Sequence, residues 1–506
     1  MALGSAALLI LAFPSFNQPW CAWIALVPWL LMLRRLAPGA AFRWSWLIGF
    51  GFFLGSIWWM VHLTDFGGPM AIVGWLALCA VLALYFGAFG WVLAAVGEKR
   101  HRFLLFAPAL WVALEYARSH LLTGFGWNLL AYSQAPWLPL IQLADLTGAW
   151  GMSFLVVLVN AAASRLIAER SRAAARQAAI AAGVVLAALG YGLWRMPQAA
   201  GAGTVRVAVV QGNIPQARKW DEAYRADILE RYAALTRQAA KASPDLIIWP
   251  ETSVPGFLGL DEELTQSLVS LSRAVDAPLL VGAPHMHLDG VRWRTGNGAA
   301  LLHAGALQQW YDKLHLVPFG EFIPFERALP WLREVLPPIG EFVPGDDSTV
   351  FGRPVPFGVL ICFEDLFPEL ARRFAQRGAR LLLVITNDAW FGPTAAAYQH
   401  AQASTFRAVE LRVPLARAAN TGWSGCIDAA GRRRGSVRDA AGTELFVPGF
   451  QACDLSLPGP AGAEGVARSL YLAWGDWFAW LCIGLTAVYN QRIKRGERIV
   501  PRRAAR

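Results

Sequence analysis

Long apolar runs fill residues 1–200, and they constrain the fold of this chain more than any other feature. Several approach the roughly 20 residues that a helix needs to cross a bilayer core. The first two are short and could instead form one re-entrant pair. With a last run at 469–490, the pattern predicts a helical membrane bundle of about eight spans, about seven of them in residues 1–200. The expected spans are 2–13, 20–33, 44–61, 71–96, 103–121, 148–168, 178–195 and 469–490.

Composition agrees with a membrane protein. Hydrophobic residues make up 56 % of the chain and charged residues only 16 %, which excludes a disordered chain and argues against a wholly soluble one. The formal net charge is +10, which in an apolar chain indicates basic loops at a membrane surface rather than binding to nucleic acid. Six cysteines without a CxxC pair predict neither a disulfide framework nor a zinc site.

Basic residues alternate between the loops. The loops Pro14–Pro19, Asp65–Pro69 and His120–Thr147 carry no Lys or Arg. By the positive-inside rule the basic loops are cytoplasmic, which places both termini and the tail 491–506 inside and residues 203–456 outside. Arg118 and Arg195 break the pattern, and we expect each to snorkel from a helix end. The basic set is Arg34, Arg35, Arg43, Lys99, Arg100, Arg102, Arg165, Arg170, Arg172, Arg176, Arg492, Lys494, Arg495, Arg498, Arg502 and Arg503.

The sequence pattern of residues 203–456 is typical of an α/β domain. Apolar runs that resemble buried strands alternate with amphipathic stretches at 221–240 and 262–275, which indicates a sheet covered by helices. Residues 415–420 and 426–429 flank the turn 421–425, as a hairpin does. The expected strands are 205–210, 244–249, 278–282, 298–303, 355–362 and 380–386.

Three strand ends in this domain carry unusual chemistry. Glu251 follows the run PDLIIW and a proline, Lys313 precedes a Pro- and Gly-punctuated stretch that ends at Glu321, and Cys362 ends the run VPFGVLIC. Each has an ordinary interpretation by itself, as a solvated loop carboxylate, a surface lysine or a buried structural thiol. Together they provide a nucleophile, a base and a cation, because a thiol must lose its proton to react and an ammonium favours thiolate and oxyanion alike. His315 is an alternative base, although its imidazole would have to turn back two residues from Lys313.

The three motifs resemble the Glu-Lys-Cys triad of the nitrilase superfamily. They are WPE (249–251), YDKLHLVPFGE (311–321) and ICFED (361–365). The stretches VVQGNIPQARKW (209–220), TNDAWFG (386–392), QHAQASTFRAVELRVP (399–414) and HLLTGFGWNLLAYSQ (120–134), with the apolar runs, look like the apolipoprotein N-acyltransferase family. The resemblance implies an extracytoplasmic αββα sandwich at 203–456, joined to the membrane bundle.

The resemblance also implies roles for individual residues. Glu251 looks like the general base, Lys313 like the oxyanion-stabilising cation and Cys362 like the nucleophile. Glu321, Glu364 and Phe363 match supporting positions, although many members of the family carry Tyr where this chain has Phe363. The expected substrate-binding positions are Trp220, Asn297, Trp390 and Phe391. We expect no metal and no cofactor.

The function that the resemblance implies is a transfer between two lipids. The acyl donor is a phospholipid, and the acceptor is the terminal amine of a diacylated apolipoprotein in the bacterial cytoplasmic membrane. We expect a multi-pass monomer that works through a Cys362 thioester. Two other classes of protein remain: a membrane-tethered amidase or nitrile hydrolase, and a non-catalytic receptor or transporter. The receptor or transporter is suggested only by Glu115 and Arg118 in the fifth apolar run, because ionisable residues inside a membrane often mark transport paths. Their i, i+3 spacing also fits a local ion pair.

Overall fold

The computed structural model divides into a helical unit and an α/β unit. The helical unit comprises 1–64, 71–195 and 473–506, and the α/β unit comprises 65–70 and 196–472. The residues that the structure describes are 2–96, 103–199, 203–289, 291–326, 328, 330, 341–459 and 469–497. The predicted cytoplasmic residues Lys99, Arg100 and Arg102, and the tail from residue 498, lie outside this set.

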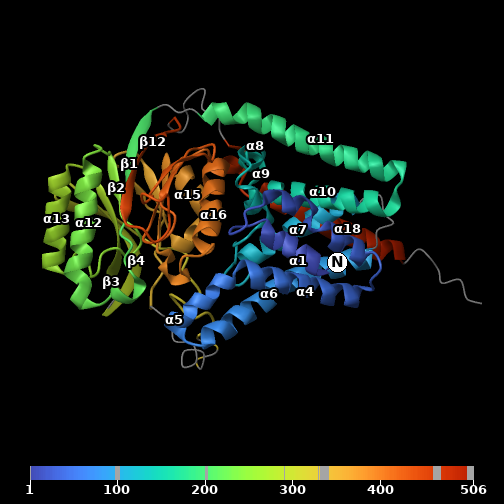
Figure 1. Ribbon diagram of the computed structural model, residues 1–506, viewed down its shortest axis with the longest axis horizontal. Coiled ribbons are helices and arrows are strands. Elements are labelled where there is room, and N and C mark those ends of the chain that lie inside the picture. The colour runs from blue at the N-terminus through green and yellow to red at the C-terminus, as the bar shows by residue number, and fades with distance from the viewer. Residues whose placement is uncertain are drawn as a thin grey trace, which may run out of the picture. The chain divides into compact units, whose positions relative to one another are not determined.

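Apolar helices build the first unit (Figure 1). Among the described residues, α6, α10 and α11 are long and apolar enough to cross a bilayer. A fourth span results if α4 and the helical segment Trp58–Gly67 form one span that bends by 61° at the break between them. The count of about eight is therefore not confirmed, because α1 has only ten residues and the run 19–33 is broken into pieces. The helices are α1 (Ala2–Leu11), α2 (Ala22–Ala25), α3 (Val27–Leu33), α4 (Pro38–Ser56), α5 (Thr64–Gly67), α6 (Met70–Val96), α7 (Phe103–His120), α8 (Leu138–Ile141), α9 (Ala144–Thr147), α10 (Ala149–Glu169), α11 (Arg172–Arg195), α17 (Leu470–Trp474) and α18 (Trp477–Glu497).

Two arginines of the helical unit are buried and paired. Arg195 Nε lies 2.7 Å from Asp145 Oδ2, and Arg118 donates to the carbonyl oxygen of Trp127 at 2.7 Å. The expectation that both snorkel is wrong, because each guanidinium finds acceptors inside the unit. Glu115 accepts from the Leu130 backbone N–H at 2.8 Å, so the polar side chains of α7 fix the loop that follows it.

Two six-stranded sheets form the centre of the α/β unit. The first has the order β12-β1-β2-β3-β4-β5 and the second β11-β10-β9-β8-β7-β6. β1, β2 and β3 run parallel, as do β7, β8 and β9, and the outer strands are antiparallel. The strands are β1 (Thr204–Gln211), β2 (Leu246–Ile248), β3 (Leu279–Asp289), β4 (Arg292–His303), β5 (Ala306–Asp312), β6 (Val350–Phe351), β7 (Phe357–Ile361), β8 (Leu381–Thr386), β9 (Leu415–Ala419), β10 (Gly425–Ile427), β11 (Arg433–Ser436) and β12 (Gly449–Ser456).

Helices cover the outer faces of both sheets, which gives the αββα layering expected from the sequence. α12 (Arg225–Ala240) and α13 (Glu262–Val275) bury their apolar sides against the first sheet, where Tyr232 stacks on Trp249. α15 (Pro368–Gln376) and α16 (Ala396–Leu411) pack on the second sheet. All six expected strands and both expected helices are present. The unexpected edge strand β12 pairs with β1 along its whole length.

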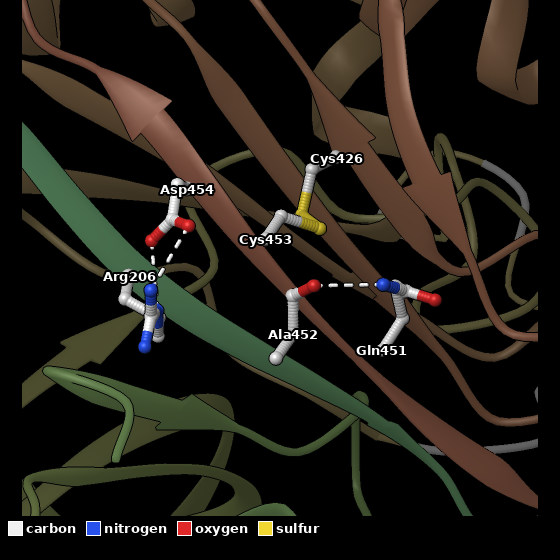
Figure 2. Close-up of a disulfide and its surroundings, with 6 residues drawn as sticks. All are labelled: Arg206, Cys426, Gln451, Ala452, Cys453 and Asp454. Carbon is white, nitrogen blue, oxygen red and sulfur yellow. Dashed lines mark hydrogen bonds and ion pairs between the residues drawn. A yellow bond between two sulfur atoms is a disulfide. The ribbon is translucent and has the colours of Figure 1, made fainter. Parts of the chain in front are cut away.

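A disulfide joins the two sheets. Cys426 lies on β10 of the second sheet and Cys453 on β12 of the first, 27 residues apart, and Figure 2 shows the bond between these strands. The cysteine spacing, which predicted no disulfide framework, did not reveal this pair, because the fold, and not a local CxxC spacing, brings the two thiols together. Cys362 is free. The hairpin β9–β10 is present as expected.

Candidate active site

Glu251 lies just beyond the end of β2, and both of its carboxylate oxygens are held by N–H donors. Asn297 Nδ2 donates to Oε1 at 2.8 Å, and the backbone N–H of Asn387 donates to Oε2 at 2.9 Å. Glu251 is 7 % exposed as a residue. The chain then turns sharply, since Thr252 has a φ of 45°, a region that non-glycine residues seldom adopt. The structure thus presents the Glu251 carboxylate in one orientation.

Lys313 follows the last residue of β5 and is fully buried. Its ammonium donates to Glu321 at 2.9 Å and lies 3.6 Å from Glu251 Oε1. Asn297 also bridges these two carboxylates, because its Nδ2 donates to Glu321 at 2.9 Å. Burial alone lowers the pKa of Lys313, but the carboxylates of Glu321 and then Glu251 outweigh it and hold this pKa above its usual value. Lys313 is therefore a fixed positive charge.

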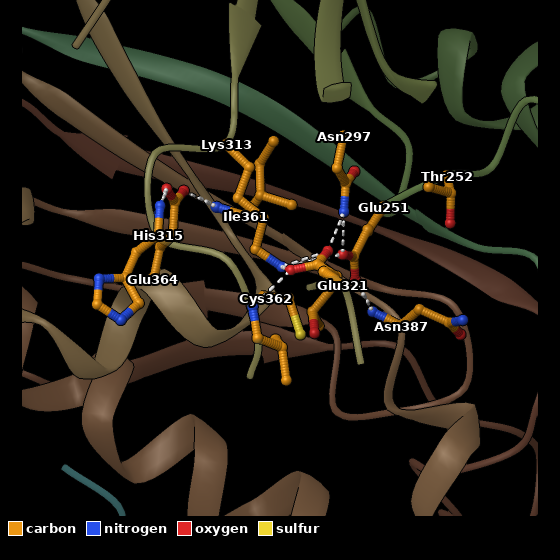
Figure 3. Close-up of polar contacts among 12 residues, drawn as sticks. Glu251, Thr252, Asn297, Lys313, His315, Glu321, Ile361, Cys362, Glu364 and Asn387 are labelled. Atoms are coloured by element: carbon orange, nitrogen blue, oxygen red, sulfur yellow. Dashed lines mark hydrogen bonds and ion pairs between the residues drawn. The ribbon is translucent and has the colours of Figure 1, made fainter. Parts of the chain in front are cut away.

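Cys362 lies at the turn that follows β7. Its φ is 54°, a strained conformation of the kind found at functional sites. Burial, followed by the charge of Glu251, raises the pKa of the thiol well above its usual value, although Lys313 opposes this effect. Figure 3 shows the thiol beside the cluster of Glu251, Lys313 and Glu321. The resting thiol is consequently protonated and needs a base to react.

Glu364 connects the loop of Lys313 to the turn at Cys362. Its carboxylate accepts backbone N–H donors from Leu314 at 2.7 Å, His315 at 3.1 Å and Ile361 at 2.7 Å, and the hydroxyl of Tyr311 at 2.9 Å. Burial raises the pKa of Glu364 to about 7, against the lowering effect of its hydrogen bonds. Glu364 therefore fixes the loop of Lys313 against the turn at Cys362, and it lies in Figure 3 on the far side of Ile361 from Glu251.

His315 and Phe363 lie near Glu364, and the rings of both contact the ring of Phe367. The His315 ring lies 3.6 Å from the Phe367 ring, centroid to centroid, and the Phe363 ring lies 5.2 Å from Phe367. In Figure 3 the His315 imidazole points away from the Cys362 thiol. Glu251, and not His315, is accordingly the base that the geometry favours.

A buried charge network, which the sequence analysis missed, lies behind Cys362. His400 bridges Asp365 at 2.9 Å and Asp388 at 3.1 Å, and its Nε2 lies 3.2 Å from the carbonyl oxygen of Cys362. Arg417 contacts Asp365 at 2.9 Å. Burial raises the pKa of each aspartate, but His400 and Arg417 outweigh it and hold both pKa values below their usual range. The network braces the strained Cys362 turn from α16 and β9.

Lys219 is a second buried lysine at the site, and the sequence analysis missed it too. Its ammonium donates to the carbonyl oxygen of Glu251 at 3.0 Å and to the hydroxyl of Thr252 at 2.5 Å. Burial lowers the pKa of Lys219 to about 8, against the opposing charges of Glu251 and Cys362. The only signal in the sequence was its place inside the stretch VVQGNIPQARKW, directly before Trp220. Lys219 secures the strained turn that carries Glu251.

The expected aromatic residues are not drawn into the charged cluster. Trp220 is 53 % exposed. Trp390 and Phe391 lie in a short 3₁₀ helix after β8, and the ring of Trp390 meets that of Phe66, at a centroid distance of 4.8 Å. Asn297, another expected substrate-binding residue, contacts Glu251 directly. The other three contribute apolar surface on the same unit.

This arrangement has the parts needed for acyl transfer through a thioester. A protonated thiol, an oriented carboxylate and a fixed ammonium meet at the carboxyl ends of β2 and β7 and at the end of β5. The carboxylate can take the thiol proton, and the ammonium can stabilise an oxyanion.

Comparison with known proteins decides the family. An apolipoprotein N-acyltransferase from Geobacter metallireducens is 38 % identical to this chain over 503 residues, which covers 96 % of this chain and 94 % of the relative. The chain belongs to the apolipoprotein N-acyltransferase family. It is therefore an acyltransferase of the nitrilase superfamily.

Further matches agree with this family. Enzymes of the same name from Methylococcus capsulatus and Brucella suis are 33 % and 36 % identical, over 98 % and 82 % of this chain and 96 % and 81 % of their own. The family models for the apolipoprotein N-acyltransferase N-terminal domain and for carbon-nitrogen hydrolase match residues 5–162 and 206–441. Among solved structures, an amidase from Nesterenkonia sp. is similar at 23 % identity and a TM-score of 0.37, over 50 % of this chain and 90 % of that one.

Proposed function

We propose that this acyltransferase moves an acyl chain from a membrane phospholipid to the terminal amine of an S-diacylglyceryl-cysteine apolipoprotein. The observation that carries the proposal is that the partly exposed Cys362 lies beside the buried pair Glu251 and Lys313 (Figure 3). The chain is also related over nearly its whole length to apolipoprotein N-acyltransferases. The names of these relatives supply the lipoprotein substrate. The phospholipid donor follows from the expected location of the site at a membrane.

The first half-reaction forms a thioester. Glu251 takes the proton of Cys362 as the sulfur attacks the ester carbonyl of the phospholipid. Lys313 and the backbone N–H of Phe363 stabilise the negative charge on the carbonyl oxygen. When the tetrahedral intermediate collapses, the C–O bond breaks, Glu251 returns the proton to the leaving alkoxide, and a lysophospholipid departs. The acyl group then remains on the sulfur.

The second half-reaction transfers that acyl group to nitrogen. The lipoprotein amine attacks the thioester carbonyl while Glu251 accepts a proton from it, and the same donors stabilise the oxyanion. The C–S bond breaks, the thiolate regains its proton from Glu251, and an amide is released. Trp220, Trp390 and Phe391 offer apolar surface to the lipid chains. No cofactor takes part in either step.

A bilayer location explains why an enzyme of this kind needs a helical unit. Each buried CH₂ group contributes about 0.8 kcal/mol to the retention of a lipid in the membrane, so a soluble enzyme would have to extract both substrates against that cost. We propose that a monomer spans the cytoplasmic membrane of a bacterium about eight times, with residues 203–456 on the periplasmic side and residues 491–506 in the cytoplasm. The alternation of basic loops and the disulfide Cys426–Cys453 support this orientation, because disulfides persist in oxidising compartments.

Orientation has a direct test. An alkaline phosphatase fusion near residue 300 should be active, and one placed after Arg495 should be inactive. The reverse pattern would overturn the topology, whatever the enzyme's substrates.

A membrane-tethered amidase or hydrolase is the alternative that shares the same triad. The two functions differ only in the second nucleophile, which is an amine in one and water in the other. The experiment is to incubate the detergent-purified chain with phospholipid and a synthetic diacylated lipopeptide, and to measure both products by mass spectrometry. We expect N-acylated lipopeptide in excess of free fatty acid. Free fatty acid alone, at a rate that the lipopeptide does not change, would favour the hydrolase.

A further inference from the structure

Two histidines and an aspartate converge on the first sheet, away from the triad. His285 and His287 lie two residues apart on β3, which places both on one face of the strand. Asp312 ends β5, and β4 runs between the two strands. One Asp312 oxygen lies 3.0 Å from His285 Nδ1, and the other lies 3.4 Å from His287 Nε2. One potential ligand atom from each residue lies within 4.8 Å of the others.

Two glycines of β4 leave the space in which these side chains meet. A Cβ atom at Gly296 would lie 2.9 Å from Asp312 Oδ1 and 3.0 Å from His287 Nε2, and one at Gly298 would lie 3.1 Å from Asp312 Oδ1. A Cβ atom at Gly296 would come closer to Asp312 Oδ1 than real Cβ atoms do, and one at Gly298 would be a tight fit against the same oxygen. A side chain at Gly296 would therefore displace the ligand atoms of Asp312 and His287, and one at Gly298 would crowd Asp312.

The donor set and its spacing match a transition-metal ion. Zn²⁺ binds imidazole nitrogen and carboxylate oxygen at about 2.0–2.2 Å in a tetrahedron, so that neighbouring ligand atoms lie about 3.4 Å apart. The distances from the Asp312 oxygens to the two imidazoles are 3.0 and 3.4 Å, and the ligand atoms of the two histidines lie within 4.8 Å of each other. The ring of His285 stacks on Trp310 at a centroid distance of 4.0 Å, which orients one ligand. The three side chains are partly exposed, so a solvent molecule can supply a fourth ligand.

We propose that His285, His287 and Asp312 form a binding site for one divalent transition-metal ion, with Zn²⁺ the ion that best fits two imidazoles and a carboxylate. The bound ion ties β3 to β5 across β4. Because side chains alternate between the faces of a strand, Asp312 occupies the face opposite to that of Lys313. The site is thus separate from the thiol, and the proposal does not rest on the proposed substrates.

The test is zinc binding by the full-length chain, purified in detergent with an affinity tag that lacks histidine. After treatment with EDTA, the protein is titrated with Zn²⁺ against a chelating dye, and retained zinc is measured by mass spectrometry. We expect one zinc per chain. His287→Gln should weaken zinc binding by at least about 100-fold, since it removes a direct ligand. Gly296→Ala should weaken it at least tenfold while it keeps all three ligands, and the control His303→Gln should bind as wild type.

The catalytic thiol is the main competing ligand, and a second variant separates the two sites. Cys362→Ser should still retain one zinc, and Co²⁺ in place of zinc should give visible bands without a thiolate charge-transfer band. Failure of the wild-type chain to retain zinc would show an ordinary His–Asp pair and overturn the proposal. Unchanged affinity in both His287→Gln and Gly296→Ala, or loss of zinc in Cys362→Ser, would also overturn it.

Discussion

Replacement of Glu251 by Gln removes the proposed base with almost no change in side-chain shape. In the structure both carboxylate oxygens accept N–H donors, Asn297 Nδ2 at 2.8 Å and Asn387 N at 2.9 Å. A Gln side chain has one acceptor oxygen and one NH₂ donor, so in either orientation its NH₂ group faces one of these donors. The variant therefore loses the base and also sets a donor against a donor, which costs about 1–3 kcal/mol locally.

Two opposing effects set the size of the loss in acylation rate. Loss of a general base lowers a rate by about 10²–10⁴. The charge of Glu251, however, is one of the causes that raise the pKa of the Cys362 thiol, second only to burial. Glu251→Gln removes that charge and leaves Lys313 in place, so thiolate forms more readily in the variant. We therefore expect a loss of about 10²–10⁴ near pH 7 that becomes smaller as pH rises, because the thiolate fraction grows about tenfold per pH unit below the thiol pKa.

The assay is single-turnover release of lysophospholipid, in step with acyl mass on the protein, between pH 6.5 and 9.5. Glu263→Gln on the exposed side of α13 makes the same chemical change outside the site and should keep the wild-type rate. Wild-type acylation by Glu251→Gln at pH 7 would refute the role of Glu251 as base. A deficit that stays constant across the pH range would refute the argument that the thiol of the variant must ionise by itself.

Three further predictions concern groups around the triad. Lys219→Met should slow acyl-enzyme formation about tenfold, because the turn of the base loses two buried hydrogen bonds; the exposed Lys241→Met is its control, and equal rates in the two variants would contradict the role. Glu364 has a pKa raised to about 7, so its contribution to stability is complete below its usual pKa and is lost as pH rises through about 7. Glu364→Gln should therefore flatten the fall in melting temperature between pH 5.5 and 8. An unchanged slope of melting temperature against pH would count against this. Removal of the Cys426–Cys453 disulfide, which closes a loop of 27 residues, should lower the unfolding free energy of the α/β unit by about 3.5 kcal/mol with acylation at 25 °C unchanged; an unshifted urea midpoint would contradict it.

The sequence was most informative where local pattern and local chemistry coincide. Continuous apolar runs identified the central strands. The structure brings together three residues at strand ends, Glu251, Lys313 and Cys362. The edge strand β12 is less apolar than the central strands, and its pairing with β1 depends on a partner more than 200 residues away. No local pattern encodes such a contact.

Residues whose role depends on long-range packing escaped the sequence analysis. Lys219 resembles a surface lysine until the fold buries its ammonium against the Glu251 turn. His400 bridges two aspartates that belong to separate motifs. The number of membrane spans is a different case, because proline and short lengths break the first apolar runs into pieces that hydropathy alone joins together.

We propose that the acyl group passes through Cys362, and a mass measurement in two stages can follow it there. The purified chain is incubated with a phospholipid that carries one labelled acyl chain, separated from the lipid, and then mixed with diacylated lipopeptide. We expect an added acyl mass on the Cys362 peptide that disappears as the same label arrives on the lipopeptide amine, and no acyl mass in Cys362→Ser. Labelled lipopeptide formed by Cys362→Ser at the wild-type rate, or an acyl-enzyme that the amine cannot discharge, would contradict the proposal.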